Sequence, residues 1–152
     1  MNVAKIQQEI LKQLIADASR VKYFDAPEDK IFLTVDAYVG YLLPRDQLHI
    51  ELTGTQLSLS LWDLIEDSTQ NVHNLLMETD EYRLGGKARK YVRSDDTEAE
   101  IYVNQDLLKN FDHPQLWQLP GDPRRGIAVT ETFCSDGAPI PVGLVMPVQV
   151  DK

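Results

Sequence analysis

The residue types that most often perform chemistry are present in this chain but are scattered along it. His49, His73 and His113 have no second histidine or cysteine three or four residues away, which is the usual spacing of a zinc site. Cys134 is the only cysteine, and a pairing with a distant histidine cannot be recognised from one sequence. We therefore expect no metal and no cofactor, and we interpret these side chains as surface or packing groups.

Two pairs of carboxylates have a spacing that acid–base catalysis could use, namely Asp95 with Asp96 and Asp63 with Glu66. Acidic pairs on turns and at the starts of helices more often act as caps or as solvated charge. No arrangement of residues identifies a reaction or a small-molecule substrate. The sequence therefore predicts a protein that is not an enzyme.

A basic stretch at residues 82–94 is the main electrostatic feature of the sequence, because it contains five basic residues and no acidic one. Single-strand binding proteins combine cations that contact phosphates with aromatic rings that stack on bases. We therefore predict a nucleic-acid contact here, made by Arg83, Lys87, Arg89, Lys90, Tyr91 and Arg93.

The predicted strand of residues 87–94 gives this stretch two faces. Because side chains along a strand alternate between its two faces, we expect one face to be cationic, formed by Lys87, Arg89, Tyr91 and Arg93. The alternative is an ordinary solvated face of an antiparallel sheet, balanced by Glu98 and Glu100 on the next strand. Both interpretations stay open at this point.

Two other groups also have a functional and a structural interpretation. Arg124 and Arg125 lie in the turn PGDPRRG, which could bind an anion or simply form a surface turn. The turn lacks the ending of a P-loop, and the sequence contains no GxGxxG motif. Trp62 and Trp117 suit either the core of a sheet or an oligomer interface.

Apolar spacing in the first half predicts one helix and a set of short strands. Three- and four-residue spacing after Asn2 predicts an amphipathic helix over residues 3–19. A short helix is expected after Ser60, followed by a polar connection over residues 66–74. Runs of β-branched and aromatic residues predict an antiparallel meander, with a candidate fourth strand at 48–52, in the ranges 21–24, 31–35 and 38–43.

The second half predicts a hairpin followed by a brief helix and further strands. Gly85-Gly86 permits the positive φ angles of a tight two-residue connection between strands at 75–84 and 87–94. Asn104 can cap a helix over residues 105–111, preceded by a strand at 98–103. The last three strands are expected at 115–119, 126–131 and 142–150.

These elements together predict an α+β fold with a mostly antiparallel sheet and two main helices. The 152 residues suit a single domain with a sizeable core, organised as two halves of about 1–66 and 75–150. The net charge of −9 argues against a general nucleic-acid coat protein. No apolar run approaches the roughly 20 residues that span a bilayer, and no signal peptide is recognised, so we expect a cytoplasmic protein without membrane contact.

Three segments resemble the DNA sliding clamps, the polymerase processivity factors. EAEIYVNQDLLKNF (98–111) is similar to the clamp strand that enters a helix, GLVMPVQV (143–150) is similar to the closing strand, and TVDAYVGYLLP (34–44) looks like a pair of clamp strands. The resemblance implies a single-domain, phage- or prophage-type clamp-like fold with duplicated helix-plus-three-strands units. It further implies a non-enzymatic DNA-replication accessory or scaffold, with DNA, a partner protein or a second copy as possible partners.

Two features of this sequence differ from the clamp pattern. Known rings contain several such domains, so this chain would have to form a homo-oligomer. The first helix carries Lys5 and Lys12 against Glu9 and Asp17, whereas clamp helices present basic residues to DNA. The alternative interpretation is a protein–protein interaction module that binds no DNA.

Overall fold

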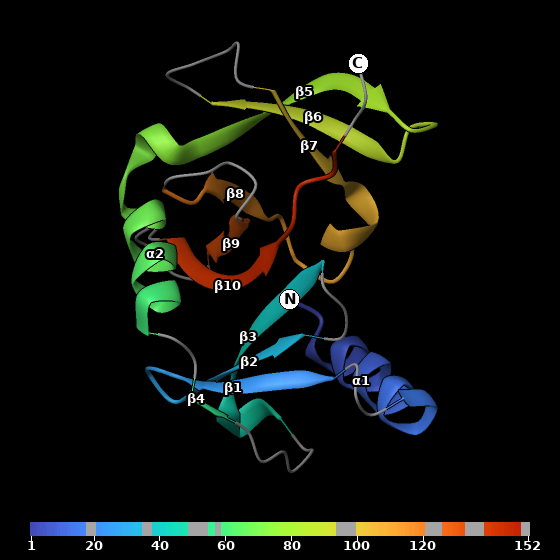
Figure 1. Ribbon diagram of the computed structural model, residues 1–152, viewed down its shortest axis with the longest axis vertical. Helices are drawn as coiled ribbons and strands as arrows, with labels where there is room; N and C mark the ends of the chain where they lie inside the picture. Colours follow the sequence, from blue (N-terminus) through green and yellow to red (C-terminus); the bar gives the residue numbers. More distant parts are fainter. Residues whose placement is uncertain are drawn as a thin grey trace.

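A computed structural model describes residues 1–17, 21–34, 38–48, 55–56, 59–93, 100–120, 126–132 and 139–149 (Figure 1). Its α-helices are α1 (Val3–Asp17) and α2 (Leu59–Gln70). Short 3-10 turns η2, η3 and η4 cover Arg45–Gln47, Val72–Asn74 and Gln105–Leu108. The strands are β1 (Lys22–Ala26), β2 (Lys30–Thr34), β3 (Val39–Pro44), β4 (Thr55–Gln56), β5 (Leu75–Arg83), β6 (Ala88–Arg93), β7 (Glu100–Asn104), β8 (Gln115–Gln118), β9 (Ile127–Thr132) and β10 (Pro139–Val145).

Within the described residues, ten strands form a single sheet in the order β4-β1-β2-β3-β10-β9-β8-β5-β6-β7. Neighbouring strands are antiparallel except for the two-residue β4, which runs parallel to β1. The meander β1-β2-β3 and the hairpin β5-β6 agree with the predictions. The α+β, mostly antiparallel fold expected from the sequence is therefore confirmed.

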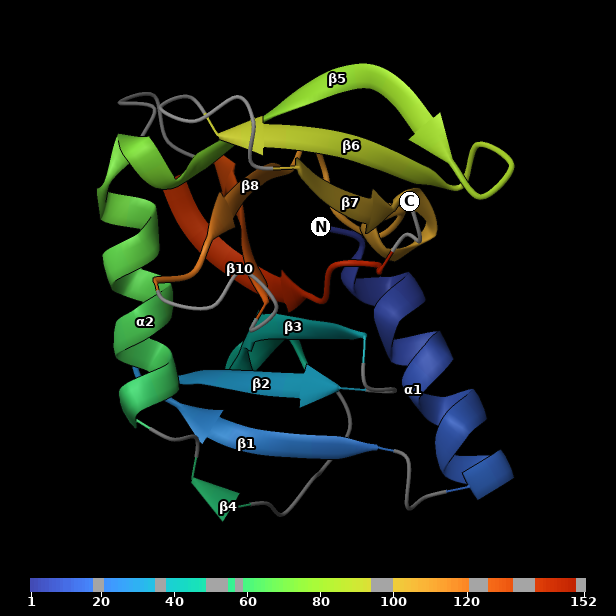
Figure 2. The ribbon, with the colours of Figure 1, turned by 45° about the horizontal axis from the view of Figure 1, so that its top comes forward.

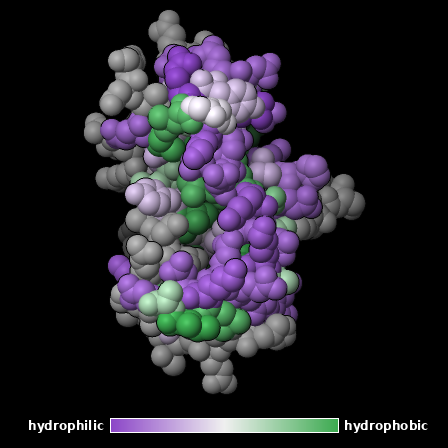
Figure 3. All heavy atoms as spheres, turned by 90° about the vertical axis from the view of Figure 1, so that its right-hand side faces the viewer, coloured by the Kyte–Doolittle hydropathy of each residue, from purple (hydrophilic) through white to green (hydrophobic). Residues whose placement is uncertain are grey.

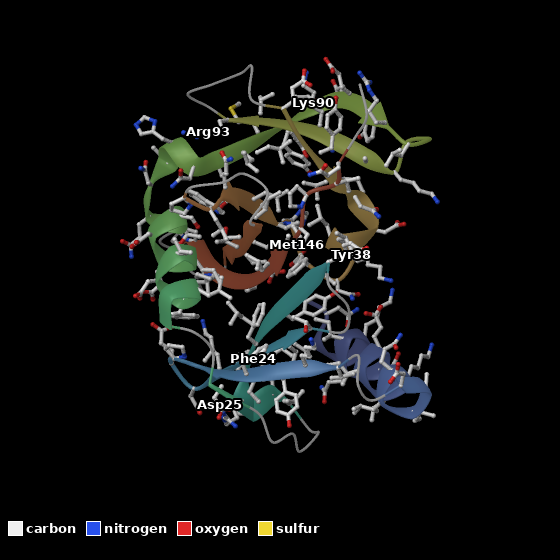
Figure 4. The ribbon with its side chains drawn as sticks, viewed as in Figure 1. Phe24, Asp25, Tyr38, Lys90, Arg93 and Met146 are labelled. Carbon is white, nitrogen blue, oxygen red and sulfur yellow. The ribbon has the colours of Figure 1, made fainter. Side chains whose placement is uncertain are left out.

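The chain that follows β10 connects two distant parts of the sheet. The backbone N–H of Met146 donates to the carbonyl of Tyr38 at 2.8 Å, and that of Val148 donates to the carbonyl of Tyr102 in β7, also at 2.8 Å. Met146 and Tyr38 lie side by side at the centre of Figure 4. The part of the sheet from β10 to β7 is therefore curled, and this segment links its first strand to its last. Strand β10 ends at Val145, whereas the sequence predicted a strand that reaches residue 150.

The two helices lie on opposite sides of the sheet (Figure 2). Helix α1 buries Ile6 and Ile10 in the main core, which continues beneath the strands of both halves. Helix α2 covers the other face and contributes Trp62 and Ile65 to two smaller apolar clusters. Trp62 and Trp117 are 5% and 6% exposed, as expected for core residues.

Two glycines allow β3 and β10 to meet in the middle of the sheet. A Cβ atom at Gly143 would lie 2.5 Å from the carbonyl oxygen of Gly40 and 2.7 Å from the ring of Phe111. A Cβ atom at Gly40 would lie 2.3 Å from the ring of Phe32. Close approach of backbone and rings therefore requires glycine at both positions.

Helix α2 extends further than the sequence predicted. Residues 66–70 form its last turns instead of a polar connection. The hydroxyls of Ser68 and Thr69 donate to the carbonyls of Ile65 and Glu66, so their polarity is satisfied inside the helix.

The predicted helix after Asn104 is shorter in the structure, and the predicted hairpin loop is longer. The helix expected over 105–111 is the single turn η4, although Asn104 does accept the backbone N–H of Asp106 as expected of a cap. The hairpin loop has four residues rather than two, because Arg83 pairs with Ala88. Most of the candidate strand at 48–52 lies outside the described residues.

Candidate interaction surface

The predicted cationic face of β6 points toward the core. Strand β6 pairs with β7 in the register Tyr91↔Ile101 and Arg89↔Val103. Alternation places these side chains on one face as expected, but Ile101, Val103 and Tyr91 belong to the main core, and Tyr91 is 5% exposed. Its buried hydroxyl accepts a hydrogen bond from Gln105 at 3.3 Å, and desolvation raises the pKa of this phenol. Tyr91 is therefore not available to stack on a base, and the prediction of an exposed aromatic was wrong.

Arg89 is held by several partners of the same hairpin. Its guanidinium lies 3.1 Å from the carboxylate of Glu78 and 3.7 Å from that of Asp80. The Nε–H donates to the carbonyl of Thr79 at 2.7 Å, and the group stacks over the ring of Tyr82. This charge is therefore balanced within the hairpin.

Lys90 is similarly balanced on the other face of β6. Its Nζ lies 3.1 Å from the carboxylate of Glu81 and 3.2 Å from that of Glu100 on β7. The hydrogen bonds with Glu81 and then Glu100 raise the pKa of Lys90. Glu100 therefore balances Lys90 rather than the face of Arg89 and Tyr91, for which the sequence offered it as a partner, and Glu98 lies outside the described residues.

The other three predicted contacts are separated from these and from one another. Arg93 lies at the far end of β6 from the loop and donates to the side chain of Gln118 at 3.4 Å (Figure 4). Arg83 and Lys87 are exposed beside the hairpin loop, and the guanidinium of Arg83 lies 5.9 Å from the ring centre of Tyr102. The structure therefore does not bring the six residues together as one outward surface.

The remaining candidates for chemistry stay apart. His73 and His113 are exposed, and the described residues include no group of three or more His, Cys, Asp or Glu that could hold a metal ion. The described part of the chain also includes no helix that is long and apolar enough to cross a membrane. The other candidates lie outside the described residues, namely His49, Asp95, Asp96, Arg124, Arg125 and Cys134.

One buried carboxylate has a structural explanation. Glu131 is 1% exposed, and its oxygens accept from the α-amino group of Met1 at 3.0 Å and from the backbone N–H of Asp112 at 2.5 Å. Both oxygens are thus satisfied, as a buried charge requires.

The sheet opens between β5 and β8. Only Leu75 and Leu76 of the nine residues in β5 pair with β8. Among the described residues, no strand pairs with the rest of this edge of β5, which arches away over β6 (Figure 2). An open strand edge presents backbone donors and acceptors that another chain can use.

A groove of about 690 Å³ runs beside the start of this edge. Residues 75–78 of β5 form one wall, and η4 with residues 113–116 forms the other. Its floor contains Tyr91 and Leu116, which are 5% and 2% exposed, while Met77 stands 53% exposed at the rim. Glu78 and Lys109 give the rim charges of both signs.

Sequence reasoning missed this groove. Its one local signal is the run Leu75-Leu76-Met77, since three successive apolar residues place apolar side chains on both faces of a strand. The opening itself depends on where β5 separates from β8, and those strands are 40 residues apart along the chain, from Leu75 to Gln115.

Another exposed apolar area lies on α1. Leu11 and Ile15 are 47% and 87% exposed. Figure 3 shows an apolar area at the level of α1 on a face that is otherwise largely hydrophilic. This strip lies on the surface of a single helix.

Comparison with known proteins identifies no family for this chain. No family model matches the chain, and neither a curated protein nor a solved structure matches it. The function is therefore argued from the geometry.

Proposed function

We propose that this chain is a non-enzymatic protein-interaction module that binds an extended segment of a partner protein in the groove beside β5. The observation that carries this proposal is the open edge of β5, which pairs with β8 through only two of its nine residues. Strand addition at such an edge is a common way for a domain to bind a peptide.

The groove favours a segment with alternating apolar side chains. Backbone groups of the added strand would bond to the edge of β5, while every second side chain would face the apolar floor formed by Leu116 and Tyr91. The rim charges Glu78 and Lys109 already pair with Arg89 and Glu9, so the apolar alternation of the segment should matter more than its charge.

A selection from a random peptide library against the folded protein tests this proposal. Enriched peptides should bind the wild-type protein and lose at least about tenfold in affinity to Met77→Glu, because a charge would then stand at the apolar rim. The matched control is Val72→Glu, which changes another apolar residue, 62% exposed, outside the groove. Equal loss of binding by both variants, or no loss by either, would contradict the proposal.

A DNA clamp-like role is the second candidate, supported by the arrangement of two chain segments. Residues 3–44 and residues 105–145 each contain a helical segment followed by three antiparallel strands, and they join through β3 and β10. The residues that follow η4 also contact the start of the first segment, since Lys109 lies 3.3 Å from Glu9 and the N–H of Asn2 donates to the carbonyl of Asn110. These segments are shorter than the halves 1–66 and 75–150, because α2 and β5 to β7 lie between them.

The DNA hypothesis is tested by fluorescence anisotropy of labelled single- and double-stranded DNA at low and moderate salt. Arg83 and Lys87 are the exposed cations of the predicted contact, so their joint change to Glu should abolish binding if DNA contacts this hairpin. Lys22→Glu with Arg45→Glu, two exposed cations outside the hairpin and outside α1 and α2, is the control with the same change in net charge. Binding that is absent from the wild-type protein, or reduced equally by both variants, would exclude this contact.

A further inference from the structure

The loop between β5 and β6 is a projecting apolar and basic tip. Leu84 is 57% exposed and has a φ of 54°, a left-handed conformation that is uncommon for a branched residue. A Cβ atom at Gly85 or Gly86 would meet nothing within 4 Å, so the loop stands in open space. Arg83 and Lys87 flank it, and residues 82–87 contain no acidic residue.

A pocket with an apolar interior and two glutamates at its rim lies between α2 and the start of β10. It has a volume of about 510 Å³ and contains Trp62, which is 5% exposed, beside Ile140 and its two neighbouring prolines. Glu28 and Glu66 stand at its rim. Lys30 also lines it, 3.7 Å from the carboxylate of Glu28 and over the ring of Trp62.

Helix α2 extends this acidic character beyond the pocket. Its sequence, LSLWDLIEDSTQ, contains three acidic residues and no basic one. The loop that bears Leu84 and the helix lie at opposite sides of the molecule (Figures 1 and 2). The tip of one copy therefore cannot reach its own pocket, but it can reach that of a neighbour.

We infer that the β5–β6 tip of one copy docks in the α2–β10 pocket of a second copy. Leu84 enters beside Trp62 and Ile140, and Arg83 and Lys87 lie against Glu66, Glu28 and the acidic surface of α2. Charge complementarity of this kind guides association and selects the orientation of two chains. Because the two patches differ, the contact is head-to-tail and continues from copy to copy, either into a closed ring or into an open chain.

This contact is separate from the groove beside β5, so either proposal can fail without the other. It also predicts a strong dependence on salt. The attraction between tip and pocket should be large at about 0.01 M ionic strength, where the Debye length is about 30 Å, and mostly screened at about 1 M, where it is about 3 Å.

Sedimentation velocity of the wild-type protein and two charge-reversed variants tests the contact. The tip variant carries Arg83→Glu with Lys87→Glu, and the pocket variant carries Glu28→Lys with Glu66→Lys. Each alone places like charges at the contact and should associate at least about tenfold more weakly than the wild-type protein at low salt. A mixture of the two restores opposite charges at every contact, so assembly should return.

Lys5→Glu with Lys12→Glu is the control, because it makes the same change in net charge as the tip variant on α1. Circular dichroism confirms that each variant is folded. The inference is overturned if the wild-type protein remains a monomer at the highest soluble concentration in low salt. It is equally overturned if the separate variants still assemble, or if mixing them restores nothing.

Discussion

Arg89 and Lys90 show why a basic stretch in a sequence does not by itself make a basic surface. Each of them has two carboxylates within 4.0 Å, supplied by β5 or β7. Those carboxylates lie on the neighbouring strands and come close to Arg89 and Lys90 only when the strands pair. The exposed positive charge that remains near the loop belongs to Arg83 and Lys87.

Tyr91 provides a direct test of the orientation of β6. Because its ring is buried in the main core, Tyr91→Ala should lower the free energy of unfolding by about 3 kcal/mol or more. Lys87→Ala, an exposed change four residues earlier on the same hairpin, should stay within about 0.5 kcal/mol of the wild-type protein. Urea denaturation measures both, and a loss below about 1 kcal/mol for Tyr91→Ala would place the ring on the surface instead.

The ion pairs of Lys90 should make the stability of the protein depend on pH in a defined direction. Its pKa in the folded protein is raised above the ordinary value of 10.5, first by the hydrogen bond with Glu81. The contribution of this pair to stability should therefore be fully present below pH 10.5 and disappear as the pH rises through the folded pKa. NMR titration of the lysine side chain should show the raised pKa, and Glu81→Gln should lower it; an unchanged pKa in that variant would contradict the assigned cause.

At the scale of elements, local chemistry predicted which segments form strands, and long-range packing decided where they end. The short gap between the predicted strands at 21–24 and 31–35, and the pair Gly85-Gly86, correctly marked two hairpins. Ser68 and Thr69 were misleading because their hydroxyls bond back to the helix, a choice that depends on the burial of α2 against the sheet. The groove depends on the separation of β5 from β8, for which no local signal exists.

The junction of β3 and β10 is the element on which the two halves depend. Gly143→Ala would place a methyl group against the carbonyl of Gly40 and the ring of Phe111, so it should cost about 1–3 kcal/mol of stability through overpacking. Lys12→Ala on the exposed side of α1 is the control and should change stability by less than about 0.5 kcal/mol. Thermal or urea unfolding compares them, and equal stability of the two variants would mean that the junction is loose.

At the scale of the whole molecule, the structure combines one continuous sheet with an opening at the edge of β5. The segment after β10 bonds to Tyr38 beside β3 and to Tyr102 in β7, so it links the first half to the far end of the curled second half. A net charge of −9 and the internal pairing of Arg89 and Lys90 both oppose broad contact with nucleic acid. The open edge and its groove instead suit an extended protein segment.

Amide hydrogen exchange with and without a selected peptide tests this central claim most directly. Strand addition predicts that those amides of residues 77–83 that face away from β6 gain protection when the peptide binds, because they acquire hydrogen-bond partners. Amides of β2, remote from the groove in the order of the sheet, should keep their exchange rates. Protection that appears elsewhere and leaves residues 77–83 unchanged would contradict the account.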